Sequence, residues 1–179
     1  MSLAIVVPLR DFSLAKERLR SRGVSDVTDL ARQLASGVLR ACPPRPTYVV
    51  TESDDVERFA EELGAEVLRP TTFSLNDAVT FAYRTLAARY EQLMIVHGDL
   101  KNPEGLGAYV PPAHVTVFTD HVADGTNVLV VPTGYDFHFG YGPRSKTHHV
   151  SEASRLGLAV SVIENSPWRF DVDEPSDLA

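Results

Sequence analysis

Residues 93–100 (LMIVHGDL) form a short apolar run that ends at Gly98 and Asp99. A run of this kind, bounded by a breaker, is typical of a strand buried on both faces of a mostly parallel sheet. Ligands of such sheets bind at the carboxyl ends of the strands, so Asp99 stands where a functional group is expected. We interpret His97, inside the run, as a hydrogen-bonded core residue and not as a ligand.

Apolar runs alternate with helix-period segments along most of the chain. Strands are predicted at 3–9, 47–51, 65–68, 113–118, 127–131 and 158–163, besides 93–100, and helices at 25–40, 53–63, 75–90 and 145–156. This alternation predicts one α/β domain over residues 1–179, a sandwich with a mainly parallel sheet. Strands follow one another in the last third, which predicts an antiparallel or mixed edge.

Composition excludes several classes of partner. The net charge of −7 disfavours nucleic acid, and no apolar run is long enough to cross a membrane. With a single cysteine, Cys42, no internal disulfide can form, so we expect a cytoplasmic protein. A local group of basic residues suits a small anionic ligand, although for a charge run alone a solvated basic helix is the better explanation. Its members are Arg10, Lys16, Arg18, Arg20 and Arg22.

Two aspartates near the end of the chain, Asp171 and Asp173, flank Val172. In a strand, residues two apart point to one face about 7 Å from each other, so both carboxylates can face one pocket. If Asp99 joins them, three carboxylates form a site for a hard divalent cation such as Mg2+. The alternative is that Asp171 and Asp173 are turn residues before Pro175.

Two loops are further candidates for ligand binding. Residues 124–127 (DGTN) combine a turn signal with a hydroxyl and an amide, and a simple hairpin turn explains them too. Residues 140–145 lead into a predicted helix at Ser145, whose first backbone amides, with Arg144, could hold an anion. No histidine pattern suits structural zinc, and no nucleophile elbow supports a hydrolase.

The order of these motifs resembles the guanylyltransferases that activate 2-phospho-L-lactate or phosphoenolpyruvate in the biosynthesis of coenzyme F420. The resemblance covers nearly the whole chain and is most specific in its second half. It rests on Val7-Pro-Leu-Arg10, Ala15-Lys16 with Arg18-Leu19, Leu75-Asn76, Gly98-Asp-Leu100, Gly125-Thr-Asn127, Tyr141-Gly-Pro-Arg-Ser145 with His149 and Ala153, and Asp171-Val-Asp173 before Glu174-Pro-Ser-Asp-Leu178.

The resemblance implies a nucleotidyltransferase fold of the glycosyltransferase-A, Rossmann-like type, a three-layer sandwich that binds Mg2+, GTP and a small phosphorylated carboxylic acid. It implies roles for individual residues. Arg10, Lys16 and Arg18 would bind the GTP phosphates, with Arg10, Lys16 and Asp99 taking part in catalysis. Asn76 would lie near the nucleoside, and Asp99, Asp171 and Asp173 would bind the metal. Thr126, Asn127, Gly142 and Ser145 would bind the acid.

Three positions depart from the family pattern: Arg10 replaces the usual lysine, Ser74 a glycine, and Lys101 a proline. Arginine is not a neutral exchange for lysine at a phosphate site, and Ser74 adds a side chain beside the base. The function implied is transfer of GMP from GTP to the phosphate of the acid. A related nucleotidyltransferase with another nucleotide or acceptor, or a non-catalytic nucleotide-binding relative, stays open, as does a homodimer.

Overall fold

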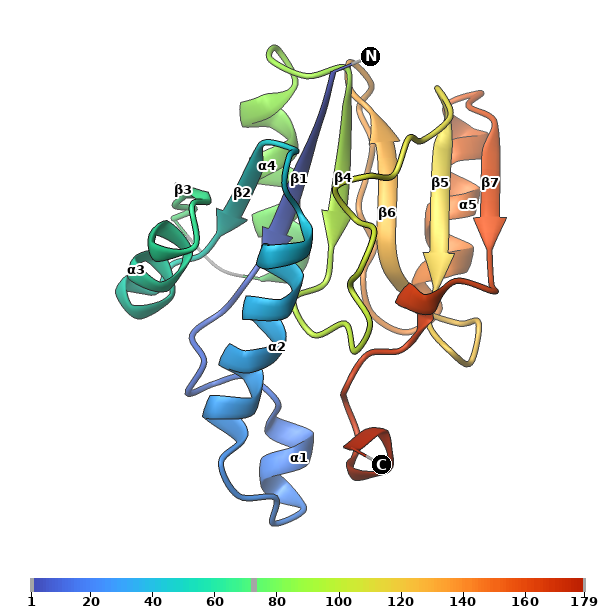
Figure 1. Ribbon diagram of the computed structural model, residues 1–179. Helices are drawn as coiled ribbons and strands as arrows, with labels where there is room; N and C mark the ends of the chain where they lie inside the picture. Colours follow the sequence, from blue (N-terminus) through green and yellow to red (C-terminus); the bar gives the residue numbers. More distant parts are fainter. Residues whose placement is uncertain (1, 72–73, 179) are drawn as a thin grey trace.

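The computed structural model describes residues 2–71 and 74–178, so residues 1, 72, 73 and 179 of the predicted domain lie outside the described part. A seven-stranded sheet with the order β3-β2-β1-β4-β6-β5-β7 forms its centre (Figure 1). The strands are β1 (Leu3–Pro8), β2 (Thr47–Val50), β3 (Glu66–Leu68), β4 (Gln92–Val96), β5 (Val115–Thr119), β6 (Thr126–Pro132) and β7 (Val160–Ile163).

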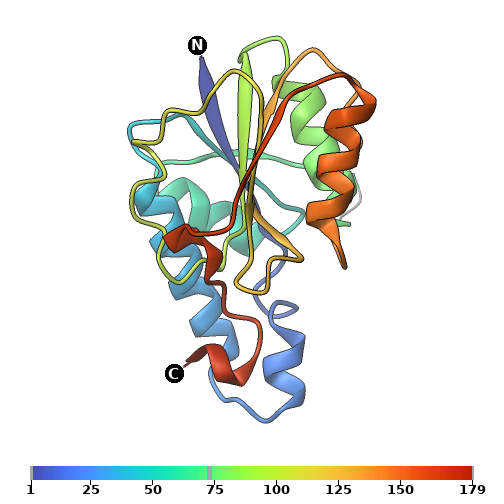
Figure 2. The ribbon, with the colours of Figure 1, turned by 90° about the vertical axis from the view of Figure 1, so that its right-hand side faces the viewer.

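Helices cover both faces of this sheet, which confirms the predicted three-layer sandwich (Figures 1 and 2). Apolar residues of α2 and α3 pack on one face, and those of α4 and α5 pack on the other. Successive strand residues point to opposite faces, so Ile5 joins the first core and Val6 the second. The helices are α1 (Glu17–Ser21), α2 (Val27–Ala41), α3 (Asp54–Glu62), α4 (Leu75–Leu86) and α5 (Ser145–Arg155).

The sheet is mixed on the side formed by its last three strands, which confirms one of the two predicted alternatives. The antiparallel strand itself lies inside the sheet and not at its edge. β6 pairs antiparallel with both β4 and β5, whereas the edge strand β7 pairs parallel with β5. Every residue of β6 is buried, because a strand lies on each side and each of its two faces belongs to one of the two apolar cores. Local hydrophobicity showed that β6 is buried but not which strands it pairs with.

Local capping explains where two helices begin. The hydroxyl oxygen of Ser53 accepts from the Val56 amide at the start of α3, and that of Ser74 accepts from the Asp77 amide at the start of α4. Serine is a preferred N-cap residue, so the starts of both helices agree with the sequence. The last predicted turn of α4 is absent from the helix, which ends at Leu86.

The C-terminal segment returns to the carboxyl ends of the parallel strands. After β7, the chain makes a 3₁₀ turn at Pro167–Arg169 and a second at Pro175–Leu178. Figure 1 shows this segment and α1 together beyond the carboxyl ends of β1 and β4. Val172 packs there against Leu19 and Val27, so a small apolar cluster joins the end of the chain to its beginning. None of the helices in the described part of the chain is long and apolar enough to cross a bilayer.

Candidate functional site

A cleft of about 360 Å3 opens at the carboxyl ends of β1 and β4. These two strands flank the point where the strand order reverses, since β2 and β3 lie on one side of β1 and β4 on the other. Open α/β sheets bind their ligands at such a point. The cleft is lined by Pro8, Leu9, Arg10, Phe12, Ala15, Lys16, Ala31, Ser74, Leu75, His97, Gly98, Asp99 and Asp173.

The three predicted metal-binding acids come together at this cleft, which Asp99 and Asp173 line and Asp171 does not. Carboxylate oxygens of Asp99, Asp171 and Asp173 all lie within 4.8 Å of one another. A backbone bridge brings them together, because Asp171 pairs antiparallel with Leu100 and the Val172 amide donates to the Asp99 carbonyl (3.2 Å). Val172 points away from the acids into the apolar cluster, as the two-residue strand period predicts.

The side chain of Lys16 extends into this group of acids. Its ammonium group forms ion pairs with Asp99 and with Asp173 Oδ1 (3.2 Å), and only 7% of the side chain is exposed. Burial disfavours the lysine charge, but the two carboxylates outweigh it and raise the pKa of Lys16. Burial likewise favours the neutral form of Asp99, yet the Lys16 charge lowers the pKa of Asp99.

Asp171 is in the opposite electrostatic situation. Its burial and the nearby charges of Asp99 and Asp173 raise the pKa of Asp171, because like charges disfavour a second and third carboxylate in one place. Neither of the ion pairs of Lys16 is to Asp171. The group of acids therefore carries more negative charge than its single buried lysine balances.

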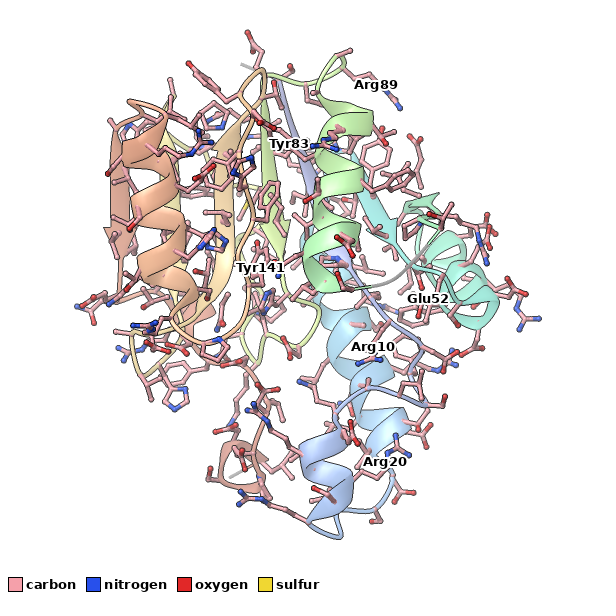
Figure 3. The ribbon with its side chains drawn as sticks, turned by 180° about the vertical axis from the view of Figure 1, so that it is seen from behind. Arg10, Arg20, Glu52, Tyr83, Arg89 and Tyr141 are labelled. Carbon is pink, nitrogen blue, oxygen red and sulfur yellow. The ribbon has the colours of Figure 1, made fainter. Side chains whose placement is uncertain are left out.

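The basic residues predicted at the phosphates divide into two groups. Arg10 is exposed and lines the cleft together with Lys16. Figure 3 shows Arg10 just beyond the N-terminal end of α4. Arg18 is not among the lining residues, and its exposed guanidinium lies 4.0 Å from carboxylate oxygens of both Asp173 and Glu174. Lys16 and Arg10 are thus the cations placed to meet an anion inside the cleft.

Asn76 connects α4 to the loop before α5. Its Nδ2 donates to the Tyr141 carbonyl (3.2 Å) and its Oδ1 accepts from the Tyr141 amide (2.7 Å), a two-point contact. Figure 3 shows Tyr141 between α4 and α5. The structure therefore gives Asn76 an intramolecular role that sequence analysis did not anticipate. The neighbouring Ser74 and Leu75 line the cleft, but Asn76 is not among the lining residues.

The residues predicted to bind the acid gather around the start of α5. Thr126, Asn127 and Ser145 are buried, and Gly142 has a φ of 127°, in the region that favours glycine. Thr126 Oγ1 lies 3.0 Å from His149 Nδ1, and Asn127 Nδ2 donates to the Trp168 carbonyl (3.1 Å). None of these four residues is among those that line the cleft at β1 and β4.

An aspartate of the protein itself caps the amino end of α5. The Arg144 amide donates to Asp124 Oδ2 (3.0 Å), and the Lys146 amide donates to the Asp124 carbonyl (3.1 Å). The Ser145 amide donates to the Gly142 carbonyl (3.1 Å). These three amides, which the sequence suggested as an anion site, already have acceptors, so an acid bound here would need to contact other groups or displace Asp124.

His97 and Tyr141 carry polar atoms that sequence analysis overlooked. The His97 ring lines the cleft, and its Nε2 is buried without a hydrogen-bond partner among the described residues. The Tyr141 hydroxyl is buried in the same way. The prediction that His97 is a hydrogen-bonded core residue is therefore wrong for this atom. Its position two residues before Asp99 was the available signal, because such residues share a strand face.

The acids fit a hard divalent cation by their chemistry. Three carboxylates offer the oxygen ligands that Mg2+ prefers, and Oδ1 of Asp99 is buried without a hydrogen-bond partner. An unpartnered buried carboxylate oxygen is unfavourable unless something binds it. Among the described residues, this is also the one group of three or more potential ligands close enough to share an ion.

Comparisons with known proteins agree with this geometry. The family model described as "Guanylyl transferase CofC like" matches residues 3–179. The chain is 30% identical over 190 residues to a phosphoenolpyruvate guanylyltransferase of Rubrobacter xylanophilus, covering all of this chain and 93% of that protein. It is 26% identical over 195 residues to a 2-phospho-L-lactate guanylyltransferase of Methanothermobacter thermautotrophicus, covering 99% and 83%.

A solved structure supports the fold. A nucleotidyl transferase from Methanothermobacter thermautotrophicus superposes with a TM-score of 0.67 at 16% identity, covering 99% of this chain and 94% of that one. At this identity the likeness concerns the arrangement of the sheet and its helices. It confirms the predicted nucleotidyltransferase-like α/β fold.

Proposed function

Because the chain belongs to the CofC-like guanylyl transferase family, we propose that it transfers GMP from GTP to the phosphate of phosphoenolpyruvate or 2-phospho-L-lactate, in the biosynthesis of coenzyme F420. The observation that carries this proposal is the meeting of Asp99, Asp171 and Asp173 with Lys16 at the charged end of the cleft. Such a site can hold a cation and a phosphate chain side by side.

The proposed reaction needs no nucleophilic side chain. A phosphate oxygen of the acid attacks the α-phosphorus of GTP, and the bond from that phosphorus to the bridging oxygen breaks. Pyrophosphate leaves with the electron pair. Catalysis then depends on holding two anionic substrates in line and on stabilising the charge that develops.

Each group of residues has a place in this proposal. Lys16 and Arg10 bind phosphate oxygens of GTP, and the apolar lining near Leu9 and Leu75 accommodates the nucleoside. The acid is bound around the start of α5, by Thr126, Asn127, Gly142 and Ser145. Arg18 contributes positive charge for the GTP phosphates from its position near Asp173. Asp99, Asp171 and Asp173 hold Mg2+. When bound, the ion supplies positive charge that offsets repulsion between the substrates.

The decisive experiment measures pyrophosphate release by the purified protein with GTP, Mg2+ and each acid in turn. We expect release only when GTP and an acid are both present, and almost none from the variant Asp99→Asn. Arg20→Met is a suitable control, because Arg20 is exposed and its hydrogen bonds are to Ala15 and Thr28. Absence of pyrophosphate with every acid would contradict the proposal.

Because Ser74 departs from the family pattern, other nucleotides should be tested in the same assay. Its side chain lines the cleft where the family pattern has a glycine, so the space beside the base differs. Pyrophosphate release with another nucleoside triphosphate or phosphorylated acceptor would identify a related transferase. Nucleotide-induced stabilisation without product would identify a non-catalytic relative.

A further inference from the structure

The sheet fixes the position of His97 at the end of β4. The His97 amide donates to the Asn127 carbonyl (3.0 Å), which extends the pairing of β4 with β6 by one residue. Leu93 and Ile95 point into the core under α4 and α5. His97 follows with the same period of two, so its ring lies on that face, and His97 is also one of the residues that line the cleft.

The ring of Tyr141 packs against the ring of His97. The two ring centroids are 5.2 Å apart with an interplanar angle of 44°. Tyr141 is itself fixed, because Asn76 binds its backbone and its ring packs edge-on against His149 at 4.8 Å. The imidazole therefore has a supported orientation, although its Nε2 has no partner among residues 2–71 and 74–178.

A buried ring nitrogen without a partner is unfavourable, so it is most readily explained by a ligand atom that binds it. The chemistry of the cleft indicates which atom. Lys16, Asp99 and Asp173 make one end charged, whereas Leu9 and Leu75 are apolar. A nucleotide that places its phosphates at the acids and its base on the apolar lining places its ribose between them.

We propose that Nε2 of His97 forms a hydrogen bond with a ribose hydroxyl of the bound nucleotide. His97 lines the cleft together with Leu75 and is two residues before Asp99, so a ribose that joins a base at Leu75 to phosphates at the acids would lie near it. A hydroxyl both donates and accepts, so it can pair with the imidazole in either tautomer. This inference rests on the proposed function and adds to it that the site recognises the ribose, so that it distinguishes GTP from the analogue that lacks the bound hydroxyl.

The test measures binding by calorimetry, in the presence of MgCl2, for GTP, 2′-deoxy-GTP and 3′-deoxy-GTP. The variant His97→Phe keeps a ring against Tyr141 but removes the nitrogen. We expect the wild-type protein to bind one deoxy analogue about 10-fold more weakly than GTP, the usual effect of one lost hydrogen bond. His97→Phe should bind GTP equally weakly and should no longer distinguish it from that analogue.

A second variant separates hydrogen bonding from packing. His97→Gln retains a polar group of similar reach and should recover part of the discrimination. Equal losses for GTP and both analogues in His97→Phe, or no loss at all, would overturn the inference. Circular dichroism and the melting temperature show whether each variant is folded.

The outcome also distinguishes this inference from the proposed function. The same measurements with ATP, CTP and UTP test the ribose independently of the base. If another ribonucleotide binds in place of GTP and shows the same discrimination, the guanine assignment fails and the role of His97 stands. If GTP binds and is transferred without any discrimination against its deoxy analogues, the role of His97 fails alone.

Discussion

The Nζ atom of Lys16 lies 3.2 Å from Oδ1 of Asp173, although 157 residues separate the two positions in the chain. The same ammonium group pairs with Asp99, so one lysine contacts two of the three acids proposed to bind a metal. Without nucleotide, Lys16 partly neutralises the acids. With nucleotide and metal, the proposed function requires the ammonium to move toward the phosphates.

The first prediction is that Lys16→Met binds Mg2+ or Mn2+ more tightly than wild type when nucleotide is absent. Removing the competing cation leaves three carboxylates facing each other, so we expect a gain of about 10-fold, equivalent to ~1.4 kcal/mol. GMP transfer should nevertheless fall, because a phosphate ligand is lost. Calorimetric titration of the metal-free proteins measures the first effect, and pyrophosphate release measures the second.

Arg20→Met is the control for this experiment. It removes one positive charge from α1, the helix that follows Lys16, at an exposed position that pairs with none of the acids (Figure 3). Its metal affinity should stay close to that of wild type. Unchanged or weaker metal binding by Lys16→Met would show that the lysine does not compete with the ion.

The second prediction concerns the two-point contact between Asn76 and Tyr141. Asn76→Ala leaves the Tyr141 amide and carbonyl without their partners, so we expect a loss of about 1–3 kcal/mol in the free energy of unfolding. Hydrogen exchange at the Tyr141 amide should accelerate more than exchange elsewhere. Asn165→Ala, at an exposed position, should change neither quantity; unchanged Tyr141 exchange in Asn76→Ala would count against the role of this contact.

Sequence patterns predicted much of this site because simple geometry governs it. Asp99 ends a buried strand, and a period of two places Asp171 and Asp173 on one face, with Val172 in the core. The order of strands and helices followed from their apolar periods, and two helix caps from serine hydroxyls. Local sequence patterns are enough to predict a helix or strand whose conformation depends mainly on its own residues.

The remaining features depend on tertiary contacts that local patterns do not encode. Lys16 reaches the acids from a backbone with φ of 58°, a conformation that nothing in its neighbourhood predicts for a lysine. β6 lies between β4 and β5, and its pairing with β4 joins two strands that are not consecutive in the chain. Asp124 accepts a hydrogen bond at the amino end of α5, from the amide of Arg144, and the ring of His97 contacts that of Tyr141. Both contacts join segments that are distant in the chain.

The third prediction follows from the buried His149. Burial, and then the nearby His148 and His97, lower the pKa of His149 from 6.5 to about 3, so the folded protein keeps this ring neutral. The unfolded chain binds the proton more readily, so stability is fully present above pH 6.5 and falls as the pH decreases. The slope should approach ~1.4 kcal/mol per pH unit below pH 6.

Chemical unfolding between pH 6.5 and pH 4.5 measures this slope, above the range in which Glu152 titrates toward its pKa of about 2. His149→Phe should show a flatter dependence, although it is less stable because Thr126 and Gly140 lose a partner. Asn76→Ala is the matched control, since it is destabilised without losing an ionisable group and should keep the wild-type slope. Identical slopes in wild type and His149→Phe would contradict the assignment.

The last prediction uses the close approach of β1 and β4 at the cleft. A Cβ atom at Gly98 would overlap the Leu9 side chain at Cδ2, and Leu9 lines the cleft. In Gly98→Ala, Leu9 must therefore rotate, and we expect a cost of about 1–3 kcal/mol in stability. If Leu9 turns into the cleft, nucleotide affinity falls as well, by several-fold.

A double variant separates the two effects. Leu9→Ala in the Gly98→Ala background removes the overlapping methyl groups. The double variant should therefore bind nucleotide no more weakly than Leu9→Ala alone, although the smaller side chain weakens both the core and the contact with the nucleoside. Calorimetry with GTP and chemical unfolding of the wild type, both single variants and the double variant complete the cycle. If the losses of GTP affinity in the two single variants simply add in the double variant, Gly98 does not act through Leu9. The glycine would then be required for the backbone position of Asp99 instead.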